Sequence, residues 1–85
     1  MKLEVTLTST RGLHARLAAK IVSLAHKYQS TVEVVYEHTV IDAKSLLGLL
    51  SLAIPSGENL QIITEGDDAE DVMRELQKLL SKEDN

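Results

Sequence analysis

The chain has 85 residues, 44% of them apolar, a size and composition that suit one soluble domain with a small core. Phe and Trp are absent and only two Tyr are present, so the core must be aliphatic and a stacking surface for single-stranded nucleic acid is not expected. A formal net charge of −4 opposes binding to a nucleic-acid backbone, and the absence of cysteine excludes disulfides, thiolate catalysis and thiolate metal sites.

From the start of the sequence we do not expect a signal peptide. The start, residues 1–4, becomes charged at once, and no apolar run reaches membrane-spanning length. We therefore expect a cytoplasmic protein that does not insert into membranes. We also expect one domain over residues 1–85, in which the acidic residues 82–85 form a frayed tail.

The first part of the chain predicts a strand followed by a helix. Residues 2–8 alternate apolar and polar side chains, which is typical of a strand with one face exposed to solvent. The alternation breaks at residues 9–12. From Ala15 the apolar side chains recur at helical spacing, which predicts a helix to about Lys27.

The next part of the chain predicts a β-hairpin. Residues 31–36 are rich in β-branched side chains, and residues 39–42 have the composition of a strand that returns antiparallel to them. Only Glu37 and His38 separate the two. Two-residue turns favour Asn-Gly, so Glu-His is poor turn chemistry for this hairpin.

A leucine-rich segment over residues 46–52 predicts a short helix, which a Ser or Asp cap precedes and residues 55–57 end. At helical spacing its leucines lie on two sides, and both sides cannot easily face one core. Burial of the whole set is the usual fate of such residues. The two-sided pattern favours instead a partner interface of Leu46, Leu47 and Leu50, with Leu49 and Leu52 in the core.

The last part of the chain predicts a strand over residues 60–65 and a regular amphipathic helix, capped by Asp67 or Asp68. The element order is therefore β-α-β-β-α-β-α. With one-sided strands, this order predicts an α+β fold in which helices cover one face of a largely antiparallel sheet.

The segment Gly12-Leu13-His14-Ala15-Arg16 lies where the first strand gives way to the first helix. Unpaired N–H groups at a helix N-terminus favour anions by about 0.3–1 kcal/mol, so phosphate is well accommodated there. His14 is a candidate nucleophile and Arg16 a candidate clamp for phosphate oxygens. Spacing alone leaves the ordinary alternative open, a loop histidine beside a solvated first-turn cation.

The other histidines and serines do not predict a metal site or a hydrolase active site. His26 and His38 make no metal-ligand spacing with His14, so we expect no metal site. No nucleophile-elbow motif supports a Ser-His-Asp hydrolase. By its position alone, Ser45 is typical of a helix N-cap.

Two segments, Gly-Leu-His-Ala-Arg at 12–16 and Ala-Lys-Ser-Leu-Leu-Gly-Leu-Leu-Ser-Leu at 43–52, resemble HPr, the phosphocarrier family of the bacterial sugar phosphotransferase system. The resemblance spans nearly the whole chain. It implies an open-faced two-layer sandwich, in which three helices cover one face of a four-stranded antiparallel sheet of strand order 1423.

The resemblance also implies a function and its residues. His14 accepts a phosphoryl group at Nδ1 from phosphorylated enzyme I and passes it to sugar-specific enzyme IIA components, while Arg16 stabilises the phosphate. Such a protein is a carrier that forms a phosphohistidine intermediate rather than a free-standing catalyst, and it needs no cofactor.

Ser45 matches the regulatory serine of the family. The implied partners are HPr kinase/phosphorylase and, in low-GC Gram-positive bacteria, a catabolite-control transcription regulator. From the charge we expect no direct contact to nucleic acid, and we expect a monomer. An alternative function is an HPr-like regulatory module of carbon catabolite repression, which acts through phospho-Ser45 with little or no role in sugar transport.

One departure from the family pattern stands next to the candidate site. The family usually follows the arginine with proline, and this chain has Leu17. Proline presets φ in the first turn of a helix, so we expect Leu17 to loosen the helix start and to change the transfer rate. We also expect Leu17 to add apolar surface to the partner interface.

Overall fold

The computed structural model describes residues 1–82, and over these residues the elements follow the order predicted from the sequence. Four are strands: β1 (Lys2–Thr6), β2 (Thr31–Tyr36), β3 (Thr39–Asp42) and β4 (Asn59–Glu65). Three are helices: α1 (Ala15–Ala25), α2 (Leu46–Leu52) and α3 (Ala69–Lys82). None of the helices in this described part is long and apolar enough to cross a membrane.

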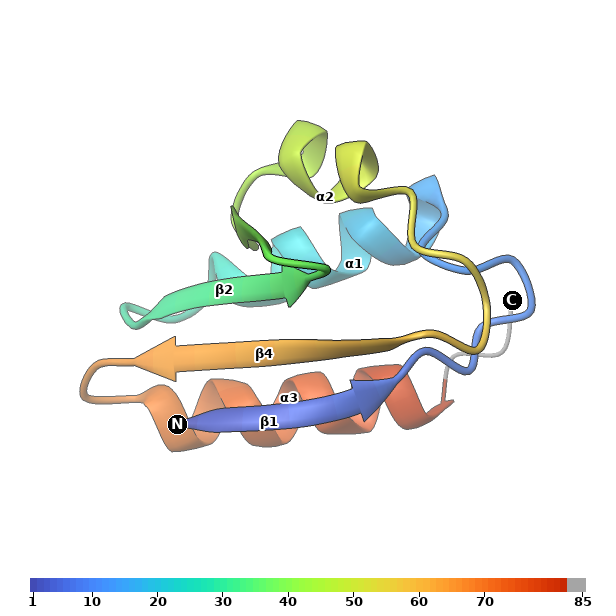
Figure 1. Ribbon diagram of the computed structural model, residues 1–85. Coiled ribbons are helices and arrows are strands. Elements are labelled where there is room, and N and C mark those ends of the chain that lie inside the picture. The colour runs from blue at the N-terminus through green and yellow to red at the C-terminus, as the bar shows by residue number, and fades with distance from the viewer. Residues whose placement is uncertain (83–85) are drawn as a thin grey trace.

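The strands form one sheet in the order β1-β4-β2-β3, and each neighbouring pair is antiparallel (Figure 1). Register places Leu3 of β1 and Val34 of β2 on either side of Ile62 in β4. Because side chains alternate along a strand, this row lies on one face, which α1 and α3 cover. The predicted open-faced α+β sandwich and its 1423 order are confirmed.

The core between the sheet and the helices is aliphatic, as the composition requires. Its largest fully buried apolar side chains come from strands, helices and loops alike: Leu7, Leu17, Val32, Leu49, Ile62, Val72, Met73 and Leu76. Tyr28 and Tyr36 are only partly buried and pack against this cluster. Aliphatic interdigitation therefore holds the layers together.

The first strand is shorter than predicted. β1 ends at Thr6, two residues before the alternating pattern does. Beyond it, the Leu7 N–H donates to the Glu58 carbonyl at 2.9 Å, and the Gly57 N–H donates to the Leu7 carbonyl at 2.9 Å. The chain after β1 is thus fastened to the loop that precedes β4.

The first helix also ends early, at Ala25 rather than near Lys27. His26 is its C-cap, and the His26 N–H donates to the Val22 carbonyl at 3.0 Å. The next amide, of Lys27, donates to the Leu24 carbonyl at 3.1 Å, three residues back. This tighter last turn closes the helix before the polar residues that follow.

The hairpin turn lies where the sequence predicts it, between β2 and β3. Glu37 and His38 both adopt left-handed backbone conformations, with φ of 48° and 72°. Histidine, like Asn, is one of the few non-glycine residues enriched at positive φ, but glutamate is not. Tertiary pairing of the two strands therefore imposes on Glu37 a conformation that this residue type does not favour.

The cap prediction for α3 needs correction at Asp68. Its main-chain carbonyl accepts the Val72 N–H at 3.1 Å, which marks the helix start. Its carboxylate turns instead to the loop before β2, where it accepts the Ser30 hydroxyl and the N–H groups of Gln29 and Ser30, each N–H at 2.9 Å. These hydrogen bonds lower the pKa of Asp68, and the bond from the Ser30 hydroxyl has the largest effect.

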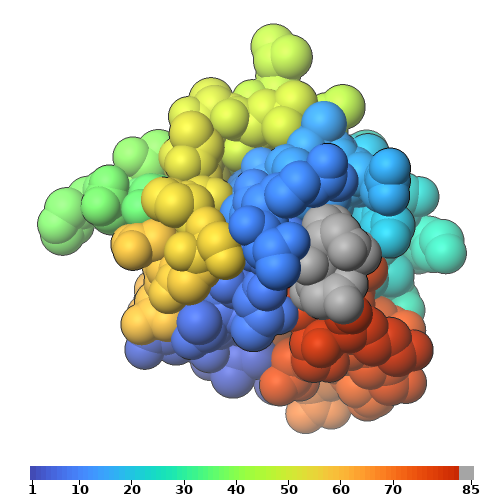
Figure 2. All heavy atoms as spheres, turned by 90° about the vertical axis from the view of Figure 1, so that its right-hand side faces the viewer, coloured from blue at the N-terminus to red at the C-terminus, as the bar shows by residue number. Residues whose placement is uncertain are grey.

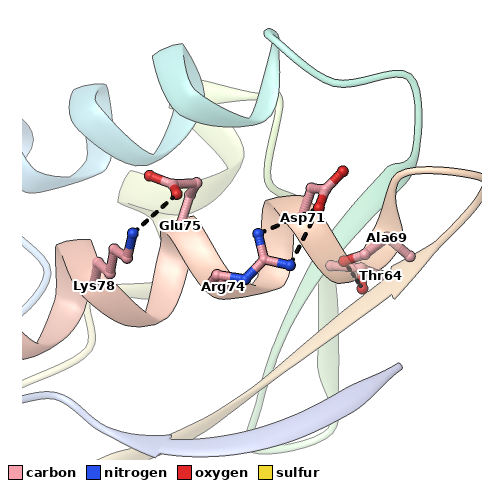
Figure 3. A network of polar contacts seen from close by, with 6 residues as sticks. All are labelled: Thr64, Ala69, Asp71, Arg74, Glu75 and Lys78. Atoms are coloured by element: carbon pink, nitrogen blue, oxygen red, sulfur yellow. Dashed lines mark hydrogen bonds and ion pairs between the residues drawn. The ribbon is translucent and has the colours of Figure 1, made fainter.

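Helix α3 carries polar contacts on its exposed side and one at its start (Figure 3). Arg74 pairs with Asp71 at 3.2 Å and Lys78 with Glu75 at 3.4 Å, exposed pairs that contribute at most about 1 kcal/mol each. The buried Thr64 hydroxyl donates to the Ala69 carbonyl at 3.1 Å and joins β4 to α3. The helix includes Lys82, and residues 83–85 of the predicted tail lie outside the described residues.

Candidate functional site

The loop between β1 and α1 carries the candidate histidine, and it is clamped to the chain that follows α2. The Leu13 N–H donates to the Ile54 carbonyl at 2.8 Å. Gly12 has a φ of +68°, and a Cβ there would lie 2.3 Å from that same carbonyl oxygen. Figure 2 shows this end of the molecule, where residues 8–16 in blue lie beside the yellow loop after α2.

His14 is the N-cap residue of α1. Its backbone is extended, with φ −85° and ψ 170°, and its carbonyl accepts the Ala18 N–H at 2.9 Å. Its Nδ1 accepts the Leu17 N–H at 3.3 Å, the bond that a Ser or Asp oxygen usually makes at this position. Its Nε2 is buried and has no hydrogen-bond partner within the described part of the chain.

These contacts define the protonation of the ring. A nitrogen that accepts an N–H bond carries a lone pair and no proton, so Nδ1 is unprotonated and the neutral ring carries its proton on Nε2. An unprotonated nitrogen at a helix N-terminus is a nucleophile next to N–H groups that favour anions. The loop therefore places a candidate nucleophile beside a helix end that favours a phosphoryl group.

Arg16 is the second residue of α1, and its side chain is exposed. The first turn of α1 contains no acidic residue, so no carboxylate there repels an incoming anion or neutralises the positive end of the helix dipole. The guanidinium is free to approach phosphate oxygens bound near His14 because exposure leaves its rotamers open. The predicted pair thus lies at one helix start, with Arg16 two residues after the N-cap in the same first turn.

Leu17 does not form part of the surface. Its side chain is 0% exposed and belongs to the core, beside Ala18 and Ile21 of the same helix. The prediction that Leu17 adds apolar area to a partner interface is therefore wrong. The first turn of α1 directs this side chain inward, so that only its main-chain N–H faces the candidate site.

The leucines of α2 divide as predicted. Leu47 is 81% exposed, Leu46 41% and Leu50 37%, whereas Leu49 is 0% exposed. Leu52 is partly buried and packs against the core. An apolar surface thus lies on α2, and the Leu13–Ile54 bond ties the end of this helix to the residue before His14. That the exposed leucines contact partners remains a prediction.

Ser45 is the N-cap of α2, as predicted, and its hydroxyl accepts the Gly48 N–H at 3.0 Å. Lys44, the residue before Ser45, contacts His26 and Tyr28 at the end of α1 and just beyond it. Lys44 Nζ donates to the Tyr28 carbonyl, and the Lys44 carbonyl lies 3.1 Å from His26 Nε2. The half-buried Ser45 therefore lies in a segment braced between two helices.

Sequence reasoning missed the hydrogen bond from Leu17 to His14. A signal for it was present, because a residue three positions after an N-cap supplies the N–H that a capping side chain accepts, and position 17 is not proline. From the sequence we interpret the absence of proline only as a loosening of the helix start, and not as the presence of an additional N–H donor. Among residues 1–82, no group of three or more His, Asp or Glu side chains is placed to hold a metal ion.

Comparison with known proteins places these features in a family. The family model described as the PTS HPr component phosphorylation site matches residues 1–82. The chain is 39% identical to the HPr-like protein Crh of Halalkalibacterium halodurans over 80 residues, which cover 94% of this chain and 95% of that protein.

Two further relatives carry the HPr name. The chain is 36% identical to the phosphocarrier protein HPr of Pseudomonas aeruginosa over 80 residues, covering 93% of this chain and 89% of that protein. The crystal structure of HPr-C-His from Thermoanaerobacter tengcongensis superposes with a TM-score of 0.92 at 32% identity, covering 95% of this chain and 91% of that one.

Proposed function

The chain belongs to the HPr family of phosphocarriers of the sugar phosphotransferase system, and on that premise we propose that His14 is its phosphoryl acceptor. His14 takes the group from phosphorylated enzyme I and passes it to enzyme IIA components. The observation that carries the proposal is that Nδ1 of His14 lies at the N-terminus of α1 and accepts the Leu17 N–H at 3.3 Å. Positioning and charge neutralisation supply most of the catalysis in such a transfer.

Arg16 is the second residue of the proposed site. Its exposed guanidinium lies in the first turn of α1, where it adds positive charge to a protein of net charge −4. A planar cation binds phosphate oxygens in a bidentate manner and stays charged at every relevant pH. Arg16 therefore stabilises the phosphoryl group on His14 and in transit.

The exposed leucines of α2 form the proposed docking surface for enzyme I and the enzyme IIA components. Leu46, Leu47 and Leu50 together expose apolar area of the kind that marks protein interfaces. Because α2 runs into the segment that binds Leu13, a partner seated on these leucines lies next to His14. One surface thus serves successive partners, which then compete for it.

Ser45 is the proposed regulatory site for HPr kinase/phosphorylase. Its phosphate would sit at the N-terminus of α2, where negative charge is tolerated by the helix. The same charge, about −1.5 to −2, would lie beside Leu46 and Leu47 and disturb an apolar contact. Phosphorylation thus leaves the fold in place and weakens exchange with enzyme I.

The test of the carrier function is phosphorylation of the chain by enzyme I and phosphoenolpyruvate, with the site mapped by mass spectrometry. We expect one acid-labile phosphate on His14, absent from the His14→Ala variant and present in His38→Asn, which keeps a residue tolerant of positive φ in the hairpin turn. Subsequent addition of an enzyme IIA should remove the label from the chain. No labelling, or labelling that survives His14→Ala, contradicts the proposal.

A second function is favoured by one finding, the 39% identity to the HPr-like protein Crh. In that case the chain acts as a regulatory module through phospho-Ser45, with little transfer from His14. The same experiment separates the two functions. Transfer of phosphate from His14 to enzyme IIA supports the carrier, whereas labelling by HPr kinase at Ser45 with none at His14 supports the regulator.

A further inference from the structure

The two ring nitrogens of His14 are both engaged or enclosed. Nδ1 accepts the Leu17 N–H at 3.3 Å, and Nε2 is buried without a hydrogen-bond partner among residues 1–82. A phosphorus atom must approach a ring nitrogen along its lone pair. The Nδ1 lone pair points at the Leu17 N–H, so the ring cannot attack phosphorus in the orientation that the structure shows.

The Leu17 N–H is held firmly in place. The Leu17 side chain is 0% exposed in the core, and the Ala18 N–H that follows is already bonded to the His14 carbonyl at 2.9 Å. First-turn amides have no acceptor within their own helix, so when Nδ1 leaves, the Leu17 N–H needs another acceptor. The imidazole is the mobile partner of this bond, because it turns about its own side-chain torsions while the amide is part of α1.

We propose that the Leu17 N–H is a positioning group with two successive acceptors, Nδ1 of the resting His14 ring and then an oxygen of the phosphoryl group on that ring. The inference rests on the proposed function, since it concerns how His14 is phosphorylated. In the resting state this hydrogen bond leaves Nδ1 without a proton and holds the ring against the first turn of α1. On transfer the ring turns outward, and the vacated N–H binds the phosphate.

The step balances without an added reagent. The Nδ1 lone pair forms the new N–P bond, and the bond between phosphorus and the donor atom of phosphorylated enzyme I breaks with its electron pair remaining on the donor. Nδ1 carries no proton that must leave, because the proton of the neutral ring is on Nε2. The outward turn also brings Nε2 from its buried position to solvent, which takes up that proton from the phosphorylated ring.

A residue without an N–H at position 17 cannot make either bond. Proline lacks this donor, and it is tolerated in the first turn of a helix. The Leu17 donor is therefore a property of this chain that distinguishes it from a chain with proline at the same position. A hydrogen bond to a charged acceptor is stronger than one to a neutral acceptor, so exchange of Nδ1 for phosphate favours the phosphorylated state.

The test compares Leu17→Pro, which removes the N–H, with Leu17→Ala, which keeps it and likewise loses the buried side chain. The equilibrium of phosphate between enzyme I and the chain should shift about fivefold toward enzyme I in Leu17→Pro relative to Leu17→Ala, a net difference between charged and neutral hydrogen bonds. Equal equilibrium constants for the two variants would overturn the proposal.

Nuclear magnetic resonance gives a readout that packing alone does not move. In the unmodified chain, ¹⁵N shifts of the His14 ring should show the Nε2–H tautomer, and Leu17→Pro should populate both tautomers. Phosphorylation should shift the amide proton at position 17 downfield, both in the wild type and in Leu17→Ala.

The two arms separate the inference from the function on which it rests. A chain that shows the expected tautomer but takes no phosphate contradicts the carrier function. A chain that is phosphorylated on His14 while its Leu17 amide stays unshifted contradicts the two-acceptor role, even where Leu17→Pro fails to fold.

Discussion

At the scale of single residues, His14 acts as the N-cap of α1, a position usually occupied by a short side chain with an oxygen acceptor. Ser, Thr, Asp and Asn are the preferred N-caps, and here an imidazole nitrogen accepts the Leu17 N–H in their place. The atom that caps α1 is thus the atom proposed to be phosphorylated. Capping and chemistry compete for one lone pair, so transfer costs the helix this bond unless the phosphate replaces it.

Gly12 is a second single residue on which the site depends, because it sets the position of His14. We predict that Gly12→Ala destabilises the fold by about 2 kcal/mol or more, since a left-handed non-glycine residue costs about 1–2 kcal/mol and its Cβ also meets the Ile54 carbonyl. Because the Leu13 bond to that carbonyl must shift, labelling of His14 by enzyme I should slow as well. Urea unfolding and labelling rates measure the two effects.

Gly57 provides the matched control for this prediction. It also has a positive φ, of +88°, but an added Cβ there meets nothing within 4 Å. Gly57→Ala should therefore show the conformational cost alone, with an unchanged labelling rate. Equal losses of stability in the two variants would mean that the contact with Ile54 does not matter.

At the scale of the element, α2 is a seven-residue helix with two different apolar sides. One side, represented by Leu49, is packed against the core, and the other is exposed. A helix this short has little stability of its own, so packing of the buried side holds it in place. The exposed leucines are then free to serve binding rather than folding.

Substitutions on the two sides of α2 should affect different properties, binding on the exposed side and stability on the buried side. Leu47→Ser, at a side chain that is 81% exposed, should change the free energy of unfolding by less than about 0.5 kcal/mol and weaken binding to enzyme I by about tenfold. Leu49→Ala should cost about 2–5 kcal/mol of stability because it empties a core position. Calorimetric titration with enzyme I and urea unfolding separate the two.

An exposed apolar residue elsewhere serves as control. Val40 of β3 is 55% exposed, and Val40→Ser should leave both stability and binding nearly unchanged. Equal weakening of enzyme I binding by Val40→Ser and Leu47→Ser would indicate a general loss of apolar surface and would argue against a docking site on α2.

Two substitutions of Ser45, the cap of α2, test the stability of the helix and the docking of enzyme I separately. Ser45→Ala should destabilise the fold by about 1 kcal/mol, because the Gly48 N–H loses its acceptor. Ser45→Asp retains an acceptor for that N–H but adds negative charge beside the exposed leucines. We expect it to unfold like the wild type while binding enzyme I more weakly, and binding equal to that of Ser81→Asp, on α3, would contradict the regulatory role.

At the scale of the whole molecule, Asp68 fastens together parts of the chain that are far apart in sequence. Its carboxylate joins the start of α3 to Gln29 and Ser30, which lead into β2 and lie 38 or 39 residues earlier in the chain. The Ser30 hydroxyl and the Gln29 amide lower its pKa, which means that the folded state prefers the ionised form. Folding thus gains stability from this carboxylate only where it is charged.

The sign of the pH dependence follows from that lowered pKa. The contribution is fully present above the pKa of an unfolded aspartate, about 3.9, and is lost as pH falls through the lower folded value. Asp68→Asn should therefore be less stable than the wild type at neutral pH, and the difference should vanish in acid. Urea unfolding from neutral to acid pH measures this, with the exposed neighbour in Asp67→Asn as control.

A difference between wild type and Asp68→Asn that stayed constant across this pH range would contradict the role of charge. So would an Asp67→Asn variant with the same loss at neutral pH, since that substitution removes an equal charge from the same helix start.

The sequence by itself determined the order of elements and the sides of the leucine helix. Alternation in 2–8 and helical spacing after Ala15 depend on neighbours in the chain, and so does the two-sided pattern in 46–52. The resemblance then supplied the strand order, which local periodicity does not contain. The ends of elements were predicted less well, because contacts such as that of Leu7 with the loop before β4 decide them.

Only the tertiary structure decided which way Leu17 points and what Asp68 binds. An apolar residue in the first turn can face a core or a partner, and packing against the sheet chose the core. An aspartate before a helix can cap it or reach another segment, and folding brought Ser30 within reach. Both choices depend on groups distant in sequence, and so does the state of the proposed phosphate site, where a buried leucine presents its N–H to His14.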